Sequence, residues 1–591
     1  MKRLHIVIAS FLVVTSMLCV ACTQDDDTGS YDKSSVEKKD STIVDSTAII
    51  FYQNDGIIRY IRYSEVDSVR PSGNGTIRAF YFNDRRVACY SINFLDSVSF
   101  NRSSAITISA FPKASDFISA IDSATAPAHT NVTEPSAPSD DEAEDYSDYI
   151  ENFSVKNTVT FTWSGNDVTW SGTVPSDVSI TKDNGHVTVE SSKGKMRYRL
   201  QGTTDDGSFN IADMNNDETD DLNKKFILEL YGVDITNPSG PAINIQSGKT
   251  VLVNLPIGKV NTLKDGEIYA QVDGESRKGT FFSEGQLVFS GPGTLNVTSL
   301  GGHGICSDDY IRFRYNVGEI NITAVKDGIN TKDYFLMYGG TVKINSSGDG
   351  IGVRRGGFEL YGGSVDITCV DDGIVSDYIN PDTAFVKIGG GRLNITTTGA
   401  KGHAVTTTGK LMVSKGTVTA STQGAASKGF NAGGDISVAD SYVYLSTEGN
   451  PQYDEEENDW SSAACIRAKS ALIISGADIF LLSSGHGSKC INAAAGVNIG
   501  TSNVVMAAKG TDYAGGDNNV RSRAVDAASL TVGGGTNLGI SAVKVAISTE
   551  GNLDITGGNT FAYTLSDDSK AVNVKGSISQ TGGLLMSGLS E

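Results

Sequence analysis

Hydrophobic and polar residues alternate in short runs along most of the chain, and a Gly-Gly pair or a near equivalent closes many of these runs. "DYFLMYGG" from Asp333 and "GGFELYGG" from Gly356 are two examples, and each is followed at once by a second alternating run. Alternation with a period of two predicts β-strands that turn one face towards an interior. The unit recurs about every 22 to 27 residues between residues 155 and 591.

A repeat of this length, with two or three short strands in each unit, is typical of a solenoid. Helical periodicity is absent from the array. Leucine-rich repeats would need Leu and Asn at fixed positions, and a propeller would need longer blades. We therefore predict an all-β chain in which residues 155–591 form a parallel β-helix of about 10–14 coils, preceded by a small β module.

The chain begins with a pattern that resembles a bacterial lipoprotein signal. Residues 1–22, "MKRLHIVIASFLVVTSMLCVAC", have a basic start, an apolar run and a small residue before Cys22, the residue expected to be lipidated. The "TQDDD" that follows resembles the acidic tag that sends some Gram-negative lipoproteins to the outer cell surface. We expect an outer-membrane lipoprotein, exposed at the cell surface and held to the membrane only through its lipid anchor.

Three further segments precede the repeats. Residues 23–42 are polar and charged, which indicates a tether. Residues 43–111 contain two similar halves in which alternating runs flank turn signals, so we predict a small β-hairpin module. Residues 112–154 are rich in Ser, Ala, Pro and Asp, a composition typical of an acidic linker.

Charge and cysteine content narrow the function. The chain has 48 basic and 69 acidic residues, a net charge of −21, so we expect no nucleic-acid partner. The acidic excess suits solubility or the binding of cations. The cysteines beyond the signal form neither a disulfide framework nor a zinc motif. Cys465 and Cys490 share one phase of the repeat, which is compatible with a disulfide or with a packed column of small residues.

Acidic residues recur at one phase of the repeat. "KDGI" at Asp327, "GDGI" at Asp349 and "DDGI" at Asp372 follow one another at steps of 22 and 23 residues. Adjacent coils of a β-helix lie about 4.8 Å apart, so these carboxylates would form a column and repel one another. A hard cation such as Ca²⁺ would remove the repulsion. The alternative is that Asp-Gly is simply a turn dipeptide on a solvated edge.

A second acidic column lies five or six residues further along each repeat, and tyrosines follow its acids. The predicted metal ligands of both columns are Asp308, Asp309, Asp327, Asp333, Asp349, Asp371, Asp372 and Asp377. An aromatic ring suits the apolar face of a sugar, and nearby basic side chains would pair with uronate carboxylates. The predicted carbohydrate-binding residues are Tyr310, Tyr334, Tyr378, Lys332, Arg354 and Arg355. The tyrosines would equally serve to cover the coil edge.

The segment "GVDITNPSGPAI" and the repeated DGI motifs resemble a family of bacterial carbohydrate-binding β-helix proteins, over roughly residues 155–590. The resemblance implies a right-handed, pectate-lyase-like parallel β-helix. It also implies binding of calcium and of plant cell-wall polysaccharides, including acidic ones. The sequence departs from the pattern at His303, where an Asp is expected, and at Arg354 and Arg355, which replace a second-column acid. The number of calcium sites therefore stays open.

We predict calcium-dependent, non-catalytic binding of a polysaccharide, expected to be acidic and of plant type, by a monomer at the bacterial surface. A pectate-lyase-like enzyme is the second interpretation, because such a lyase also uses a cation, together with a basic side chain that removes a proton. The sequence marks out no such base and no catalytic pair of carboxylates. A structural surface protein or adhesin stapled by calcium is the third interpretation.

Overall fold

The computed structural model describes residues 48–53, 58–62, 66–72, 76–81, 86–91, 93, 95–99, 111–124, 148–191, 194–212, 225–455, 458–515 and 518–590. The predicted signal with Cys22 and the predicted tether lie outside the described residues. No helix in the described part of the chain is both long enough and apolar enough to span a membrane.

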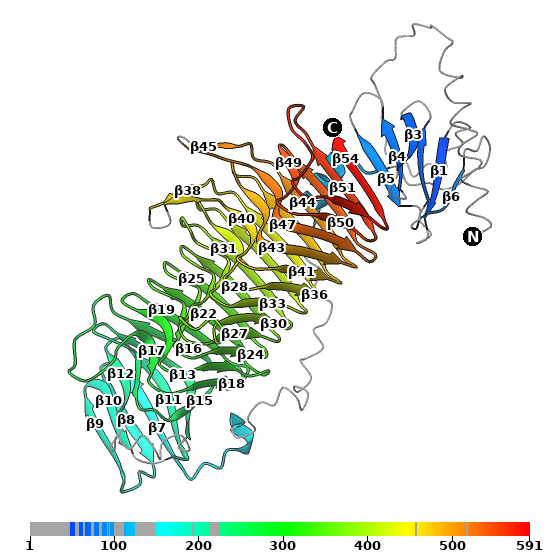
Figure 1. Cartoon of the computed structure of the whole chain (residues 1–591). Coiled ribbons are helices and arrows are strands. Elements are labelled where there is room, and N and C mark those ends of the chain that lie inside the picture. The colour runs from blue at the N-terminus through cyan, green and yellow to red at the C-terminus, as the bar shows by residue number, and fades with distance from the viewer. Residues whose placement is uncertain are drawn as a thin grey trace, which may run out of the picture. The chain divides into compact units, whose positions relative to one another are not determined.

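The described residues fall into two compact units. The first comprises the residues up to 123 together with 497–508 and those from 523 onwards. The second comprises 124–496 and 509–522. Each unit is built mainly of short strands (Figure 1).

In the second unit, most strands pair in parallel with the strand three places further along the chain. β16 pairs with β19, β19 with β22 and β22 with β25, each in register, so three consecutive strands make one coil. The stacked coils give three rows of strands, here called rows A, B and C (Figure 1). This confirms the all-β prediction and its long parallel sheets, in a solenoid-like arrangement. The right-handed sense stays a prediction.

The strands of each row have the following bounds. Row A contains β16 (Val260–Asp265), β19 (Thr294–Ser299), β22 (Glu319–Ala324), β25 (Thr341–Ser346), β28 (Ser364–Cys369), β31 (Arg392–Thr397), β34 (Thr417–Thr422), β37 (Tyr442–Thr447) and β42 (Asp478–Ser483). Row B contains β14 (Ile243–Gln246), β17 (Gly279–Ser283), β20 (His303–Ser307), β23 (Ile329–Thr331), β26 (Ile351–Val353), β29 (Ile374–Ser376), β32 (Val405–Thr407), β35 (Lys428–Ala432) and β40 (Ala464–Ala468). Row C contains β15 (Thr250–Asn254), β18 (Leu287–Ser290), β21 (Ile311–Phe313), β24 (Phe335–Met337), β27 (Gly357–Leu360), β30 (Phe385–Ile388), β33 (Lys410–Val413), β36 (Ile436–Ala439) and β41 (Leu472–Ser475).

The core lies inside the coils and follows the alternation seen in the sequence. In β25, Val342, Ile344 and Ser346 are buried, while the residues between them face outwards. Cys465 and Cys490 are buried at matching positions of β40 and β43 (Lys489–Gly500), and no disulfide joins them. They therefore pack as a column of small residues in this structure.

Antiparallel hairpins precede the regular coils. β7 pairs with β8 and β9 pairs with β10, both antiparallel, before the parallel pairs β7–β11, β11–β13 and β10–β12 begin the stack. Their bounds are β7 (Asn157–Ser164), β8 (Asp167–Gly172), β9 (Val178–Asp183), β10 (Gly185–Ser191), β11 (Met196–Thr204), β12 (Gly207–Ala212) and β13 (Lys225–Asn237).

The first unit combines the predicted hairpin module with further coils. The module contains β1 (Ala48–Gln53), β2 (Ile58–Arg62), β3 (Val66–Ser72), β4 (Thr76–Tyr81), β5 (Val87–Ser91) and β6 (Leu95–Ser99), all paired antiparallel. The coils contain β44 (Asn503–Ala508), β47 (Arg523–Gly533), β48 (Asn537–Ala542), β49 (Val545–Thr549), β50 (Leu553–Ile555), β51 (Asn559–Thr564), β52 (Val572–Val574), β53 (Ile578–Gln580) and β54 (Leu584–Leu589). β5 pairs antiparallel with one edge of β54, whose other edge pairs in parallel with β51.

The predicted linker, residues 112–154, contains ordered structure in its described parts. Helix α2 (Ala114–Asp122) turns Phe117 towards β48, where a Cβ on Gly539 would lie 2.4 Å from the Phe117 ring. A short 3₁₀ turn, η4 (Ile150–Asn152), lies at the other end of this range. Composition alone did not indicate the helix.

Candidate functional site

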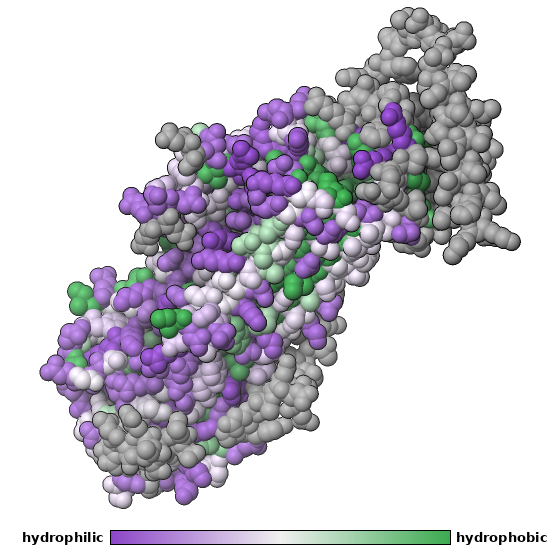
Figure 2. All heavy atoms as spheres, in the orientation of Figure 1, coloured by the Kyte–Doolittle hydropathy of each residue, from purple (hydrophilic) through white to green (hydrophobic). Residues whose placement is uncertain are grey.

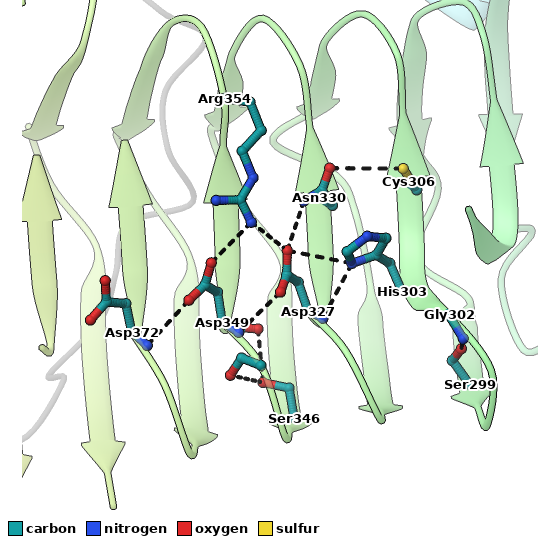
Figure 3. Close-up of polar contacts among 11 residues, drawn as sticks. Ser299, Gly302, His303, Cys306, Asp327, Asn330, Ser346, Asp349, Arg354 and Asp372 are labelled. Atoms are coloured by element: carbon teal, nitrogen blue, oxygen red, sulfur yellow. Dashed lines mark hydrogen bonds and ion pairs between the residues drawn. The ribbon is translucent and has the colours of Figure 1, made fainter. Parts of the chain in front are cut away.

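The acids of the first predicted column lie in the bend between rows A and B, side by side in successive coils (Figure 3). The backbone N–H of Asp349 donates to Oδ1 of Asp327 at 3.1 Å. The backbone N–H of Asp372 donates to Oδ1 of Asp349 at 3.2 Å. Each carboxylate therefore accepts the main-chain N–H at the same position of the next coil.

Histidines extend this series at both ends. Nδ1 of His303 accepts the N–H of Asp327 at 3.2 Å, and Nδ1 of His403 accepts the N–H of Lys428 at 3.1 Å. Oδ1 of Asp372 accepts the N–H of His403 at 2.6 Å. Burial lowers the pKa of His303, and it lowers the pKa of His403 to about 3. Both rings are therefore neutral and able to accept through Nδ1.

We call this series of side chains the acceptor ladder. It consists of His303, Asp327, Asp349, Asp372 and His403. It explains why His303 can stand where an acid is expected, because the ladder needs an acceptor rather than a charge. Sequence reasoning missed His403, although its place two residues before a row B strand matches that of the acids.

The Gly and Ile of the DGI motif have structural reasons of their own. A Cβ on Gly350 would lie 2.5 Å from both the Gly373 carbonyl oxygen and the Ile367 side chain. A Cβ on Gly328 would be equally close to Ile344. The Ile that follows each Gly is the first residue of a row B strand and is fully buried, as at Ile351. The motif thus combines an acceptor, a close approach between coils and a core residue.

Arg354 neutralises part of the ladder. Its guanidinium lies 2.6 Å from Oδ2 of Asp327 and 3.0 Å from Oδ2 of Asp349. Asn330 also donates to Asp327, at 2.7 Å. A Cβ on Gly352 would lie only 2.7 Å from the guanidinium, so a glycine leaves room for Arg354 to cross the strand. Arg354 therefore pairs with carboxylates of its own chain.

Asp349, Asp371 and Asp372 form a second grouping at the other end of the ladder. Each offers one carboxylate oxygen, and these three oxygens lie within 4.8 Å of one another. Burial, with a contribution from neighbouring carboxylates, raises the pKa of Asp372 to about 8 and that of Asp349 to about 6. Asp371 is exposed. Three carboxylate oxygens this close together repel one another, and a metal ion bound between them would relieve the repulsion.

The second predicted column, in the bend between rows B and C, has mixed partners. Asp308 forms an ion pair with Lys278, and Asp309 accepts a hydrogen bond from Gln286 at 2.5 Å. Burial raises the pKa of Asp309, and the charge of Asp333 adds to this. Asp377 is exposed. These acids do not share one arrangement from coil to coil.

The structure brings two of the three predicted tyrosines together. The rings of Tyr310 and Tyr334 stack with centroids 4.4 Å apart. The Arg312 guanidinium lies 2.7 Å from Asp148, a residue of the predicted linker, and 3.4 Å from the Tyr334 hydroxyl. Tyr310 and Phe153 both pack against the buried cluster of Ile227, Leu252 and Val288. The pair is thus partly covered by the segment that leads into the coils.

The other predicted carbohydrate-binding residues include Tyr378, Lys332 and Arg355, which follow row B strands like the tyrosine pair. Tyr378 is half-buried, and its N–H donates to Oγ1 of Thr408 at 3.3 Å. Lys332 is half-buried and Arg355 is exposed.

A groove of about 710 Å³ runs along the outer face of row A, and the sequence analysis did not single it out. Strands β19 to β37 contribute to it, and seven strands about 4.8 Å apart extend over roughly 29 Å. The outward-facing polar residues that line it are Asn296, Thr298, Asn321, Thr323, Lys343, Asn345, Asp366, Thr368, Asn394, Thr396, Thr419, Ser421 and Tyr444. On the face shown in Figure 2, hydrophilic residues are widespread and hydrophobic ones are mostly scattered.

Hydrogen bonds between coils order the groove floor. Nδ2 of Asn321 donates to Oδ1 of Asn296 at 3.0 Å, and Asn394 donates to Asp366. Lys343 forms an ion pair with Glu319 at 2.6 Å. Amides and hydroxyls supply most of the polar groups of this surface, and its charged side chains Lys343 and Asp366 already have partners. The only sequence signal was a run of Asn, Thr and Ser at outward positions, which is also typical of a solvated face.

Comparisons with known proteins found a family model, a curated relative and a solved structure that resemble parts of this chain. The model of a family described as "Carbohydrate-binding domain-containing protein" matches residues 183–423, which include the acceptor ladder and most of the groove. A carbohydrate-binding domain-containing protein of Acetivibrio thermocellus is 32% identical over 112 residues, 18% of this chain and 36% of that protein. The chain thus spans about a third of the length of this curated relative. A solved polysaccharide lyase-like protein from C. thermocellum, a gadolinium derivative, is 22% identical with a TM-score of 0.36, over 48% of this chain and 97% of that one.

Proposed function

We propose that the protein binds a polysaccharide in the groove of row A and does not cleave it. The observation that carries this proposal is the continuous polar floor, which crosses seven coils with amides and hydroxyls facing outwards. The match of the carbohydrate-binding family model over residues 183–423 supports it. The lipoprotein signal predicted from residues 1–22 would place the groove at the cell surface.

The groove has the chemistry that a sugar polymer requires. Sugar hydroxyls both donate and accept hydrogen bonds, and Asn, Ser and Thr side chains can answer both roles. The same outward positions recur at every coil, so a long chain would meet a similar contact repeatedly. Weak contacts repeated along one polymer add up to useful affinity, and short oligosaccharides should bind far more weakly.

The groove lacks the arrangement expected of a lyase. Proton removal needs a base within hydrogen-bond reach of the substrate carbon. Among the described lining residues, Lys343 is paired with Glu319 and Asp366 accepts from Asn394. A non-catalytic binder is therefore the better-supported choice, and a pectate-lyase-like enzyme stays the alternative.

Calcium dependence and an acidic polysaccharide, both predicted from the sequence, remain part of the proposal. The carboxylates of Asp349, Asp371 and Asp372 fit a hard cation, because all three offer oxygen. Burial and neighbouring carboxylates raise the pKa of Asp349 and of Asp372, and a bound cation would offset this cost of ionisation. Asp327 fits less well, since Arg354 already pairs with it. Bound calcium would add positive charge at this bend and so help an anionic chain to approach.

The decisive experiment blocks the groove without touching the ladder. Thr368 is exposed in the middle of the groove, and Ile473, 46% exposed on row C, gives a matched control. Thr368→Arg should weaken retention on neutral polysaccharide at least about tenfold, and Ile473→Arg should not change it. Affinity electrophoresis against polygalacturonate and neutral polymers, in calcium and in chelator, measures both variants. Equal binding by Thr368→Arg and the wild type would place the site elsewhere, and unsaturated products would establish the lyase alternative.

A further inference from the structure

Two antiparallel hairpins interrupt the parallel coils of the second unit. The first consists of β38 (Gln452–Asp454) and β39 (Asp459–Ser461), and the second of β45 (Tyr513–Gly515) and β46 (Asn518–Val520). They meet through three rings. Trp460 lies 5.5 Å from Tyr453 on its own hairpin and 5.5 Å from Tyr513 on the other, measured between centroids. We call Tyr453, Trp460 and Tyr513 the aromatic trio.

The packing beneath the trio holds the hairpins in place. A Cβ on Gly487 would lie 2.9 Å from both the Pro451 and the Tyr513 side chains, so the hairpins close over this glycine from two sides. His486 donates its N–H to Asn450 at 2.9 Å, and its ring lies 2.8 Å from the Thr511 hydroxyl. Rings that are ordered in advance lose little freedom when a ligand binds.

The trio stands beside the groove. The first hairpin begins shortly after β37, the strand that contributes Tyr444 to the groove. It leans back over earlier coils, because Asp454 accepts from Lys401 at 2.8 Å, and Lys401 lies in the bend that follows β31. Both β31 and β37 line the groove. The hairpin therefore flanks the edge at which the groove strands end.

The rings are available and their surroundings are acidic. Tyr453 is 41% exposed, and its hydroxyl donates to Asn458 at 2.6 Å, which fixes the orientation of the ring. Trp460 is half-buried. Asp454 and Asp459 pair across the same hairpin, next to the Tyr453 and Trp460 pair in the chain, and Glu455 is exposed there. Carboxylates accept hydrogen bonds from sugar hydroxyls but repel uronates.

We propose that the aromatic trio is a second contact for the polysaccharide, selective for a neutral sugar unit. The apolar C–H face of one pyranose ring lies on the exposed Tyr453 ring, beside Trp460, and the acidic side chains of the hairpin disfavour a uronate at this position. The rest of the chain continues into the groove. This inference rests on the proposed function, and it adds the chemical class of the sugar at one subsite.

The test uses Tyr453→Ala in the full chain, with Tyr315→Ala as control, since Tyr315 is 36% exposed and lies outside both the groove and the hairpins. Tyr453→Ala should weaken binding of a neutral polymer about two- to tenfold at an unchanged melting temperature. Tyr315→Ala should bind like the wild type. Unchanged affinity in Tyr453→Ala, with the wild type binding well, would overturn the inference and leave the groove as the site.

A second readout uses the chain's three tryptophans, Trp163, Trp170 and Trp460. In a Trp163→Phe, Trp170→Phe background, a neutral polymer should shift the emission of Trp460 and protect it from iodide. Short neutral oligosaccharides should produce the same response when Thr368→Arg is added, because the trio does not depend on the groove. A response in this blocked variant, with polymer retained as well as by the wild type, would refute the groove and keep the trio. Emission that no saccharide changes, while the wild type retains polymer, would make the trio a purely structural contact.

Discussion

Two bends of the same coils carry acids at a regular spacing, yet the fold uses them differently. Between rows A and B, every ladder position from His303 to His403 presents an acceptor to the main chain of the next coil. Between rows B and C, the N–H groups of Asp333 and Arg354 already donate to main-chain carbonyls of the preceding coil, those of Asp309 and Thr331. Side chains in the second bend are therefore free to vary.

The difference between the two bends shows why an acid can recur at one position of the repeat. Buried main-chain N–H groups need acceptors, and a bend that offers no carbonyl must obtain one from a side chain. The need for a hydrogen-bond acceptor is therefore the first explanation of a residue repeated at such a bend, and a bound ligand is the second. In the second bend the main-chain N–H groups already have carbonyl acceptors. Arg355 can therefore stand in the next coil at the position that Asp309 and Asp333 occupy in theirs.

The largest contrast should come from Asp327. Asp327→Ala removes the acceptor of the Asp349 N–H and a partner of Arg354 and Asn330. We expect a loss of about 2–4 kcal/mol in the free energy of unfolding, moderated by the 41% exposure of Arg354. Asp377→Ala, in the exposed part of the second bend, is the matched control and should change stability by less than about 0.5 kcal/mol. Chemical denaturation measures both, and equal losses would remove the distinction between the two bends.

His403 tests whether the ladder needs an acceptor rather than a particular residue. His403→Ala leaves the buried N–H of Lys428 without its acceptor, and we expect a loss of about 1–3 kcal/mol. His403→Asn keeps an acceptor oxygen near the position of Nδ1, so it should retain most of that stability. Thermal and urea unfolding compare the variants. If His403→Asn falls as far as His403→Ala, ring packing rather than the hydrogen bond dominates at this position.

A substitution at Asp372 separates the effect of its charge on stability from the effect of its hydrogen bond. Burial raises its folded pKa to about 8 from an ordinary 3.8, so this group favours folding below about pH 4 and loses that contribution as pH rises through 8. Asp372→Asn keeps an acceptor and removes the charge. At pH 8 in chelator the variant should be more stable than the wild type by about 1 kcal/mol or more, with the advantage vanishing near pH 4.

Calcium provides the second half of this test. It should raise the melting temperature of the wild type more than that of Asp372→Asn, because only the wild type gains a full set of carboxylates. Identical melting curves in chelator and in millimolar calcium would contradict the predicted calcium site.

The smallest effect belongs to Asp308. Its ion pair with Lys278 is largely solvated, with 44% of the Lys278 side chain exposed. Asp308→Ala should change the free energy of unfolding by no more than about 0.5 kcal/mol. High salt should reduce even this difference. A loss as large as that of Asp327→Ala would show that the second bend also supports the coil.

The parallel coils were predictable because alternation, glycine pairs and a steady period all indicate the same structure. The alignment of the DGI motifs in successive coils was predictable for the same reason, since a steady period brings one residue of each coil to each position. The role of Asp349 was not, because a sequence does not show which N–H groups lack a carbonyl. His403 escaped notice because it shares a function with the acids and not a residue type.

The groove and the ordered parts of the linker were harder to foresee. Asn321 and Thr368 look like ordinary solvated positions until the coils align them in one row. Helix α2 lies in a range whose overall composition is that of a linker, and only the packing of Phe117 against β48 reveals its place. Both features depend on contacts between residues far apart in the chain.

The pairing of β5 with β54 has a consequence for self-association. A stack of parallel coils has no intrinsic end, since the last strand offers unpaired N–H and C=O groups to any further strand, including one from another molecule. Antiparallel β5 occupies that edge of β54, and Tyr90 and Phe51 beside it are buried with Met586 in one cluster. The segment that contains β5 thus prevents further strands from pairing with this edge of β54. Loss of the segment before residue 124 should expose this edge of β54 to pairing with a strand of another molecule.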